Sequence, residues 1–283
     1  MCGFCISINN QDTDIKKMTK MINHRGPDST KFINTSNLKA GFNRLAIVDS
    51  DERSDQPMYD ESNRYLLLFN GEIYNYKNLK KSLIQKYNAS FETLSDTEVL
   101  LKGLCHEGSN FIEKLDGIFA FVFIDLLNLN IIMGRDQFGV KRLYYTFEKN
   151  QLIVSSELKP FNWKKNKKIK VNSVIEYITY GTVFDNKTLF ENVKELGANT
   201  FVEFSINDEK LRSKNCKNFS YGNQNHSNID DTNFIIKNTI NSQIPEISFG
   251  VTLSGGIDST IILDEVHSNP NLKAVYCVDV KHP

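Results

Sequence analysis

The feature that most constrains the fold is a succession of short, β-rich apolar runs across the first 160 residues. Such runs, rich in Val, Ile, Phe and Tyr, predict strands. The predicted strands cover 4–8, 45–49, 65–75, 117–125 and 130–134, followed by a hairpin over 143–157 that turns at 148–150. The runs at 117–125 and 130–134 are almost unbroken, which predicts a sheet buried on both faces.

Two helices interrupt these strands. Residues 13–24 form an amphipathic pattern that places Ile15, Met18 and Ile22 on one face, and the Gly-Pro loop HRGPDS ends it. Ser95 followed by Glu98 predicts a capping box that opens a helix over 95–103. The first 160 residues therefore predict an α+β fold of layered sheets and helices.

The pattern changes after residue 205. Residues 206–230 are polar and rich in Asn and Ser, which predicts a linker. Residues 231–283 then show helix, strand, Ser-Gly-Gly turn, helix and strand, a β-α-β unit that opens a parallel-sheet domain. About 55 residues are too few for a complete domain of that kind.

Charge and cysteine content exclude several classes of protein. Lys and Arg number 34, as do Asp and Glu, so nothing points to nucleic acid or an anionic membrane as a partner. The basic run at 164–170 is interpreted as a solvated loop. No apolar run approaches the roughly 18 residues of a membrane helix, and no signal peptide is recognisable. Five cysteines without framework spacing predict a reduced, cytoplasmic protein.

The chain opens MCGFC, where Cys2 and Cys5 share a CxxC spacing. On a strand their side chains point to opposite faces and their α-carbons lie about 10 Å apart. A disulfide requires about 7 Å or less, so a redox pair is disfavoured. No second ligand pair of zinc spacing follows, so no metal site is predicted.

Position gives Cys2 a different chemistry. Removal of Met1 would leave a thiol and an α-amine on one residue. The amine has a pKa of about 8 and can take and return a proton, while the thiolate is the nucleophile. Cys2 is therefore a candidate N-terminal nucleophile.

Four further residues support that interpretation, each with a plainer alternative. Asn70 and Gly71 carry the donors of an oxyanion hole, or they form a simple Asn-Gly turn. Arg44 can hold a carboxylate, or it lies on the surface. Asp96 can bind a substrate ammonium, or it only complements the helix dipole.

A second constellation, LSGGIDST at 253–260, stands between a predicted strand and a predicted helix. Small residues let backbone N–H groups approach an anion, and the helix N-terminus adds positive potential. The motif differs from the GxxxxGK[ST] loop of phosphoryl-transfer enzymes. Asp258 can also be an ordinary carboxylate of the first helical turn.

Eight motifs in order identify a family. They are MCGF, HRGPD, NRLAIVD, FNGEIYNY, SDTEV, DGIFAFVFID, RDQFGVKRLYY and SSELK. Together they resemble the class II, N-terminal-nucleophile glutamine amidotransferase domain, most closely that of glutamine-hydrolysing asparagine synthetases, over residues 2–205. The resemblance implies a four-layer αββα fold.

The resemblance also implies roles. Cys2 would attack the glutamine side-chain amide, and Asn70 and Gly71 would stabilise the oxyanion. Arg44 would clamp the α-carboxylate, and Asp96, helped by Glu72, would receive the α-ammonium. The backbone that would line the site belongs to Leu45, Ala46, Ile47 and Val48. His24, in the loop beside the pocket, receives no chemical role.

LSGGIDST resembles the pyrophosphate loop of ATP-pyrophosphatase domains. This resemblance implies a nucleotide site with Mg²⁺, and its residues would be Leu253, Ser254, Gly255, Gly256, Asp258, Ser259 and Val278. The implied reaction is two-step: glutamine hydrolysis supplies ammonia, and ATP activates the aspartate β-carboxylate that ammonia converts to asparagine.

Two departures from the family stand out. Arg142 replaces the usual proline of GVKPLYY, and the chain ends before the second nucleotide motif and the aspartate-binding residues. We therefore expect the chain to be a fragment or truncated product, with synthetase activity absent unless another chain completes it. The partners expected are such a complementing synthetase chain or a second copy in a homodimer.

Three alternatives stay open at this stage. The first is a related amidotransferase with another acceptor, such as a surface sugar or a lactam precursor. The second is a phosphoribosyl or fructose-phosphate amidotransferase, which LSGGIDST argues against. The third is a non-catalytic glutamine-binding module, which Cys2, Asn70, Gly71 and Asp96 argue against.

Overall fold

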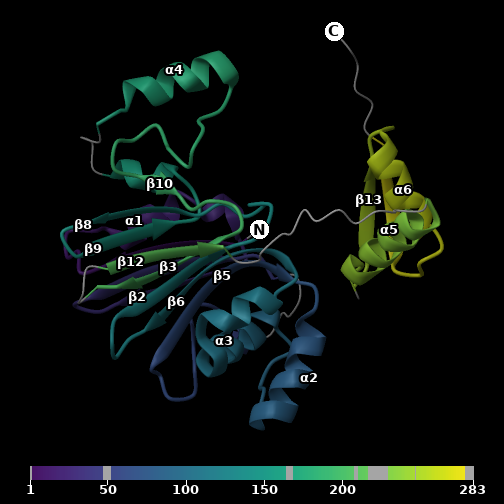
Figure 1. The fold of residues 1–283 in the computed structure, drawn as a ribbon, viewed down its shortest axis with the longest axis horizontal. Helices are drawn as coiled ribbons and strands as arrows, with labels where there is room; N and C mark the ends of the chain where they lie inside the picture. The colour runs from purple at the N-terminus through teal and green to yellow at the C-terminus, as the bar shows by residue number, and fades with distance from the viewer. Residues whose placement is uncertain are drawn as a thin grey trace. The chain divides into compact units, whose positions relative to one another are not determined.

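The computed structural model describes residues 2–46, 52–163, 168–206, 210–215, 229–245 and 247–277. The chain divides into two compact units, Met1–Asn218 and Phe219–Pro283 (Figure 1). Each unit is described by itself.

The first unit contains two six-stranded sheets whose strand pairs are all antiparallel. One sheet has the strand order β10-β8-β9-β1-β3-β2, and the other has the order β12-β11-β7-β6-β5-β4. The strands are β1 Gly3–Ile8, β2 Ser29–Asn34, β3 Leu38–Arg44, β4 Met58–Tyr59, β5 Tyr65–Ile73, β6 Gly117–Asp125, β7 Asn130–Arg135, β8 Tyr144–Glu148, β9 Gln151–Ser155, β10 Lys194–Glu195, β11 Thr200–Ser205 and β12 Lys210–Asn215.

Helices complete the unit. The α-helices are α1 Ile15–Lys20, α2 Tyr76–Tyr87, α3 Asp96–Glu107 and α4 Val171–Tyr180. Short 3₁₀ helices cover Asn23–Arg25, Glu52–Ser54, Gly108–Lys114 and Lys159–Trp163. In Figure 1, α2 and α3 lie together on the outer side of the sheet that contains β5 and β6.

Three apolar cores define four layers. The largest core lies between the sheets and takes Phe4 and Phe42 from one and Leu68 and Val122 from the other. A second core joins the outer face of the β5–β6 sheet to α2 and α3, and a third joins the outer face of the β1 sheet to α1. The order is helix, sheet, sheet, helix, which confirms the predicted αββα fold.

Strand β1 shows how the opening CxxC is divided between layers. Phe4, Ile6 and Ile8 belong to the core between the sheets, whereas Cys5 belongs to the core under α1. Cys2 packs against the core between the sheets. Both cysteines are free thiols on opposite faces, as strand geometry predicted.

The predicted hairpin is confirmed, whereas the helix predicted at 13–24 is shorter, because α1 covers Ile15–Lys20 and a separate 3₁₀ helix covers Asn23–Arg25. Ile15, Met18 and Ile22 are buried together below the β1 sheet. Strands β8 and β9 pair in register on either side of Lys149 and Asn150. Both turn residues have positive φ, 48° and 59°, as the turn of a two-residue hairpin of type I′ requires.

The capping box at α3 does not form. Ser95 caps the helix by accepting from the Thr97 N–H at 3.1 Å. The Ser95 N–H is already donated to Thr93 Oγ1 at 3.2 Å, so Glu98 has no reason to reach back to it. Glu98 instead accepts from the backbone N–H groups of Glu92 and Thr93 and fixes the loop that precedes the helix.

Asn70 and Gly71 do not form a turn, so that alternative was wrong. Strand β5 continues through both residues to Ile73, and Gly71 pairs with Phe119 of β6. A Cβ on Gly71 would lie 2.2 Å from the Ile118 carbonyl oxygen. Glycine is present here because the neighbouring backbone approaches closely.

Two further boundaries differ from the prediction. The strand expected at 45–49 is instead β3, which ends at Arg44, while 47–49 lie outside the described residues. The expected linker at 206–230 starts too early, because 210–215 pair with β11 as the edge strand β12. The polar sequence KLRSKN hid this strand, and polar residues are typical of sheet edges. Residues 216–228 of the expected linker lie outside the described residues.

The second unit contains α5 Ile229–Gln243, β13 Phe249–Leu253, α6 Ile257–Val266 and β14 Leu272–Cys277. Strands β13 and β14 are parallel, and α6 lies between them in the chain. This is the predicted β-α-β unit. Across the described parts of both units, no helix combines the length and the apolar character needed to cross a lipid bilayer.

Candidate active site

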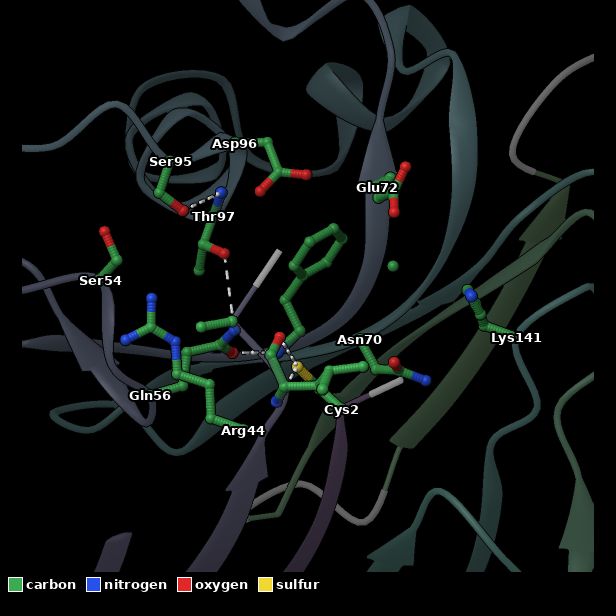
Figure 2. A pocket seen from close by; sticks show the side chains of 14 residues that line it. Cys2, Arg44, Ser54, Gln56, Asn70, Glu72, Ser95, Asp96, Thr97 and Lys141 are labelled. Carbon is green, nitrogen blue, oxygen red and sulfur yellow. Dashed lines mark hydrogen bonds between the residues drawn. The ribbon is translucent and has the colours of Figure 1, made fainter. Parts of the chain in front are cut away.

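One pocket of the first unit gathers most of the residues predicted for the glutamine site (Figure 2). Cys2 directly precedes β1, Arg44 ends β3, Asn70 to Glu72 lie in β5, and Asp96 begins α3. The predicted residues that line the pocket are Cys2, Arg44, Leu45, Ala46, Asn70, Gly71, Glu72 and Asp96. Ile47 and Val48 lie outside the described residues.

Cys2 is held at the floor of this pocket. Its Sγ lies 3.4 Å from the Leu45 backbone nitrogen and 3.5 Å from the Leu45 carbonyl oxygen. Burial raises the pKa of the Cys2 thiol, while the Leu45 hydrogen bond and the charge of Arg44 oppose that rise. A buried thiol of this kind needs a base or added positive charge to become a thiolate.

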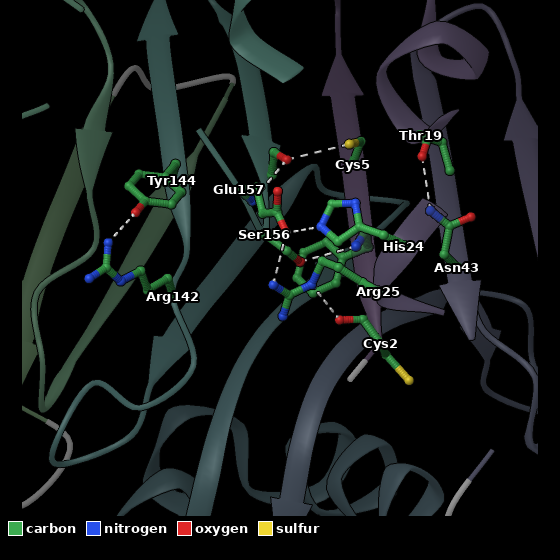
Figure 3. A network of polar contacts seen from close by, with 12 residues as sticks. Cys2, Cys5, Thr19, His24, Arg25, Asn43, Arg142, Tyr144, Ser156 and Glu157 are labelled. Atoms are coloured by element: carbon green, nitrogen blue, oxygen red, sulfur yellow. Dashed lines mark hydrogen bonds and ion pairs between the residues drawn. The ribbon is translucent and has the colours of Figure 1, made fainter. Parts of the chain in front are cut away.

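A polar chain fixes the Cys2 backbone from the opposite side (Figure 3). Arg25 Nε donates to the Cys2 carbonyl oxygen at 2.9 Å, and Arg25 Nη1 donates to Glu157 Oε1 at 3.1 Å. His24 Nε2 contacts the same Glu157 oxygen at 2.8 Å. Through these hydrogen bonds His24 is connected to Cys2 by way of Glu157 and Arg25.

Asn70 presents an unused donor. The residue is 1% exposed, and among the described residues its Nδ2 has no hydrogen-bond partner. A buried amide N–H₂ without a partner costs about 1–3 kcal/mol. Its position in the pocket that holds Cys2 gives it an acceptor if a substrate oxygen enters.

Arg44 and Asp96 supply opposite charges in the pocket. Arg44 pairs with Asp55, which also pairs with Lys31 at 2.8 Å, so the guanidinium is fixed at the pocket wall. Asp96 is 5% exposed and accepts from the Ile73 N–H at 3.0 Å. Burial raises the pKa of Asp96 to about 6, with the charge of Glu72 adding to the rise.

Residues 1–215 match a protein family described as the glutamine amidotransferase domain. The chain belongs to the glutamine amidotransferase family. The order of its motifs had predicted class II membership, which this match supports together with the curated relatives.

Two curated relatives of this amidotransferase carry synthetase names. Asparagine synthetase (glutamine-hydrolyzing) 1 of Bacillus subtilis is 33% identical over 288 residues, a match that covers 96% of the chain and 45% of the relative. Putative asparagine synthetase (glutamine-hydrolyzing) 2 of Methanocaldococcus jannaschii is 31% identical over 300 residues, covering 94% and 56%. The chain thus spans about half the length of these relatives.

A solved structure shares the fold. Glutamine phosphoribosylpyrophosphate amidotransferase from B. subtilis superposes with a TM-score of 0.54 at 16% identity, covering 98% of this chain and 65% of that one. The likeness confirms the fold of N-terminal-nucleophile amidotransferases for this chain.

Several pocket residues of the amidotransferase were not predicted. They are Ser54, Gln56, Phe69, Ser95, Thr97 and Lys141. Gln56 braces the wall, because its Oε1 accepts from the Phe69 N–H at 2.6 Å and its Nε2 donates to Thr97 Oγ1 at 3.5 Å. No sequence pattern marks Gln56, whereas Lys141 stands in the motif RDQFGVK, where its position could have drawn attention.

The Ser-Gly-Gly loop lies in the second unit, outside the matched amidotransferase domain. It runs from the end of β13 at Leu253 to the start of α6, and Gly255 has φ +81°. Ser259 Oγ bonds to Ser254 and to the Gly256 carbonyl, which closes the turn. Asp258 is exposed in the first turn of α6, and Val278 lies outside the described residues.

Proposed function

We propose that this chain hydrolyses glutamine to glutamate and ammonia through Cys2. The observation that carries the proposal is the buried, unpaired Nδ2 of Asn70 in the same pocket as the Cys2 thiol. An oxyanion hole needs such a donor, preorganised and lacking a partner until the transition state.

The chemistry follows from the groups present. Once Met1 is removed, the α-amine of Cys2 takes the thiol proton, and Sγ attacks the carbon of the glutamine side-chain amide. The oxygen gains negative charge and is stabilised by Asn70 Nδ2 and the Gly71 N–H. The amine returns the proton to the leaving nitrogen, so ammonia departs and a γ-glutamyl thioester remains. Water hydrolyses the thioester to glutamate and the free thiol.

The charged residues of the pocket fit the two ends of an amino acid. The guanidinium of Arg44 suits the α-carboxylate. Asp96 and Glu72 suit the α-ammonium, and bringing that cation beside Asp96 would favour its ionised form. The backbone of 45–48 would close the same side. These contacts would place the side-chain amide at Cys2.

The test compares the wild type with Cys2→Ala. We expect the wild type to release ammonia and glutamate from glutamine and the variant to release none above background. Intact-mass measurement of the N-terminus must show that Met1 is absent from the active protein. Equal release by both proteins would reject the proposal in favour of a non-catalytic glutamine-binding module.

We also propose a nucleotide site at the Ser-Gly-Gly loop. Gly255 has positive φ, and a Cβ there would meet no atom within 4 Å, so the loop leaves room for an anion beside the N-terminus of α6. Ser254, Gly255, Gly256, Asp258 and Ser259 would hold the phosphates of ATP, directly or through Mg²⁺. Leu253 and Val278 would flank the nucleotide. Bound ATP would supply the activation of a carboxylate.

Asparagine is the product that we infer, with aspartate as acceptor. The names of the relatives support this acceptor. ATP binding to this chain, measured by calorimetry with and without Mg²⁺, tests the nucleotide site. Gly255→Val disfavours the positive φ of the loop and should abolish ATP binding. An affinity for ATP equal to that of the wild type would reject the proposed nucleotide site.

A further inference from the structure

The motif RDQFGVK at 135–141 is left without a role by the proposed glutaminase chemistry. It leaves β7 and ends at Lys141, which lines the pocket that holds Cys2. Two charged residues at its start, Arg135 and Asp136, are 6% and 0% exposed. Buried charges are costly unless they are fully hydrogen-bonded, so what they bond to indicates what they fix.

Asp136 uses both carboxylate oxygens on the following loop. Its Oδ1 accepts from the N–H groups of Phe138 at 3.1 Å and Val140 at 3.0 Å. Its Oδ2 accepts from the N–H groups of Lys141 and Phe119, each at 3.1 Å. Hydrogen bonds to a charged acceptor are stronger than hydrogen bonds between neutral groups. The carboxylate thus ties the loop to strand β6.

Arg135 holds the same loop by its carbonyl groups. Its Nε donates to the Lys141 carbonyl oxygen at 2.9 Å, and its Nη2 donates to the Gly139 carbonyl oxygen at 2.6 Å. Glu195 balances the guanidinium charge at 2.8 Å. The backbone of Lys141 is therefore fixed on both sides, its N–H by Asp136 and its carbonyl by Arg135.

The side chain on this fixed backbone is half-buried, and its ammonium has no partner among the described residues. In Figure 2, Lys141 lies on the side of Asn70 and Glu72, across the pocket from Arg44. Among the described residues, its Nζ makes neither a hydrogen bond nor an ion pair. Burial lowers the pKa of Lys141, and the charges of Glu72 and Cys2 oppose this fall.

We propose that the ammonium of Lys141 acts electrostatically in the glutaminase reaction, favouring the Cys2 thiolate and the tetrahedral oxyanion beside Asn70. The inference rests on the proposed function of Cys2. Arg44 and the carboxylates already account for both charged ends of glutamine, so the positive charge of Lys141 is available for the reacting end. In a site from which water is excluded, a fixed charge acts more strongly than in bulk solvent.

The first measurement is steady-state hydrolysis of glutamine by wild type, Lys141→Met and Lys141→Arg. We expect Lys141→Met to lower kcat about tenfold, less than the loss of an oxyanion donor because Lys141 acts without direct contact. The glutamine KM should change less than kcat. Lys141→Arg, which keeps the charge, should restore part of the rate. Lys81→Met removes an exposed lysine of α2 and serves as the charge-matched control.

The second measurement does not depend on turnover. The alkylation rate of Cys2, followed by mass spectrometry of its peptide, is compared for anionic iodoacetate and neutral iodoacetamide. Positive charge near Sγ raises the rate with iodoacetate selectively. The ratio of the iodoacetate rate to the iodoacetamide rate should therefore fall in Lys141→Met and stay at the wild-type value in Lys81→Met.

The outcomes separate the two proposals. A wild-type kcat and a wild-type alkylation ratio in Lys141→Met would overturn the inference. A fall in kcat with a matching loss of melting temperature, no rescue by arginine and an unchanged ratio would also overturn it, because the role would then be structural. If the wild type releases no glutamate but the ratio still falls, the glutaminase function fails while the coupling of Lys141 to Cys2 stands.

Discussion

The two units of the chain place their candidate sites in opposite ways. In the first, the site residues stand on strands and a helix packed on both sides, so Asn70 and Asp96 are almost fully buried. In the second, Val251 and Val266 are the buried apolar residues among those described, while Ile257 beside the loop is 78% exposed. The first site depends on fixed side chains, and the second depends on backbone groups at a turn.

Asn70→Ala tests the first half of this contrast and has the largest expected effect. We expect kcat for glutamine hydrolysis to fall about 100- to 1,000-fold, as for other oxyanion-hole donors. The melting temperature should not fall, because Nδ2 gives up no hydrogen bond and the variant removes a buried donor without a partner.

Asn43→Ala is the matched control for Asn70→Ala. Asn43 is equally buried, but its Nδ2 donates to the Thr19 carbonyl oxygen at 2.9 Å and its Oδ1 accepts from Thr30 at 2.8 Å. This variant should lose stability and keep the turnover of its folded fraction. If Asn70→Ala instead lost stability and kept turnover, while Asn43→Ala lost turnover, Asn70 would have a structural role.

A pair of glycines compares the units directly. A Cβ at Gly71 would lie 2.2 Å from the Ile118 carbonyl oxygen and 2.6 Å from Phe119 Cα, so Gly71→Ala should cost about 3 kcal/mol of stability. A Cβ at Gly255 meets nothing within 4 Å, and only its φ of +81° opposes alanine, at about 1 kcal/mol.

Hydrogen exchange of β5 and α6, read by mass spectrometry, measures both glycine variants in their own units. If Gly255→Ala destabilises α6 as much as Gly71→Ala destabilises β5, side-chain packing also holds the loop of the second unit. The contrast between a site of packed side chains and a site of backbone groups at a turn would then be wrong.

Sequence reasoning succeeded where local pattern and layer packing agree. The layered α+β fold, the division of Cys2 from Cys5 and the hairpin turn at Lys149 and Asn150 follow from alternation and turn chemistry, and the family resemblance supplied the αββα order. It failed where a contact with a neighbouring segment of the fold determines the role of a residue. Gly71 resembles a turn residue until the backbone of β6 is placed beside it, and Glu98 serves the preceding loop because Thr93 already satisfies Ser95.

The candidate site was partly predictable for the same reason. Cys2, Arg44 and Asp96 carry chemistry that the sequence displays. Gln56 matters through contacts with Phe69 and Thr97, which no sequence pattern links to it, whereas Lys141 belongs to a recognisable motif whose place beside Cys2 only the fold reveals. Strand β12 was missed because an edge strand needs no apolar face.

Asp96 and Asp258 form a second pair across the units, since each is an acidic residue in the first turn of a helix. Burial raises the pKa of Asp96 to about 6, so below that pH it is neutral and attracts an ammonium less. The glutamine KM should therefore rise as pH falls through 6. Asp96→Asn should raise KM at pH 8 about tenfold or more and remove this dependence, whereas exposed Asp258→Asn should leave glutamine kinetics unchanged.

The same shift gives a stability test for Asp96→Asn. Because the pKa is raised from 3.8 to about 6, the folded state binds this proton more tightly than the unfolded state. The resulting stabilisation is complete below pH 3.8 and is lost as pH rises through about 6. Asn cannot ionise, so the variant should be more stable than wild type above pH 6, by about 3 kcal/mol. Equal unfolding midpoints in urea at pH 8 would contradict the raised pKa.

The smallest expected effect concerns the hydrogen bonds that connect Glu157 to Cys2 through Arg25. These residues are more exposed than Asn70 and Asp96. Glu157→Gln keeps an oxygen that can accept from Arg25 and removes only the charge that holds the guanidinium against the Cys2 carbonyl. We expect kcat to fall about threefold, since a partly exposed ion pair contributes about 1 kcal/mol or less.

The glutamine KM should stay constant in Glu157→Gln because Arg25 contacts the nucleophile rather than the substrate pocket walls. His24→Gln is the control: its ring is largely exposed and touches only the shared Glu157 oxygen, so kcat should stay at the wild-type value. If His24→Gln slows turnover as much as Glu157→Gln, the imidazole takes part in the chemistry. The nucleophile would then depend on the protein surface as well as on the packed sheets.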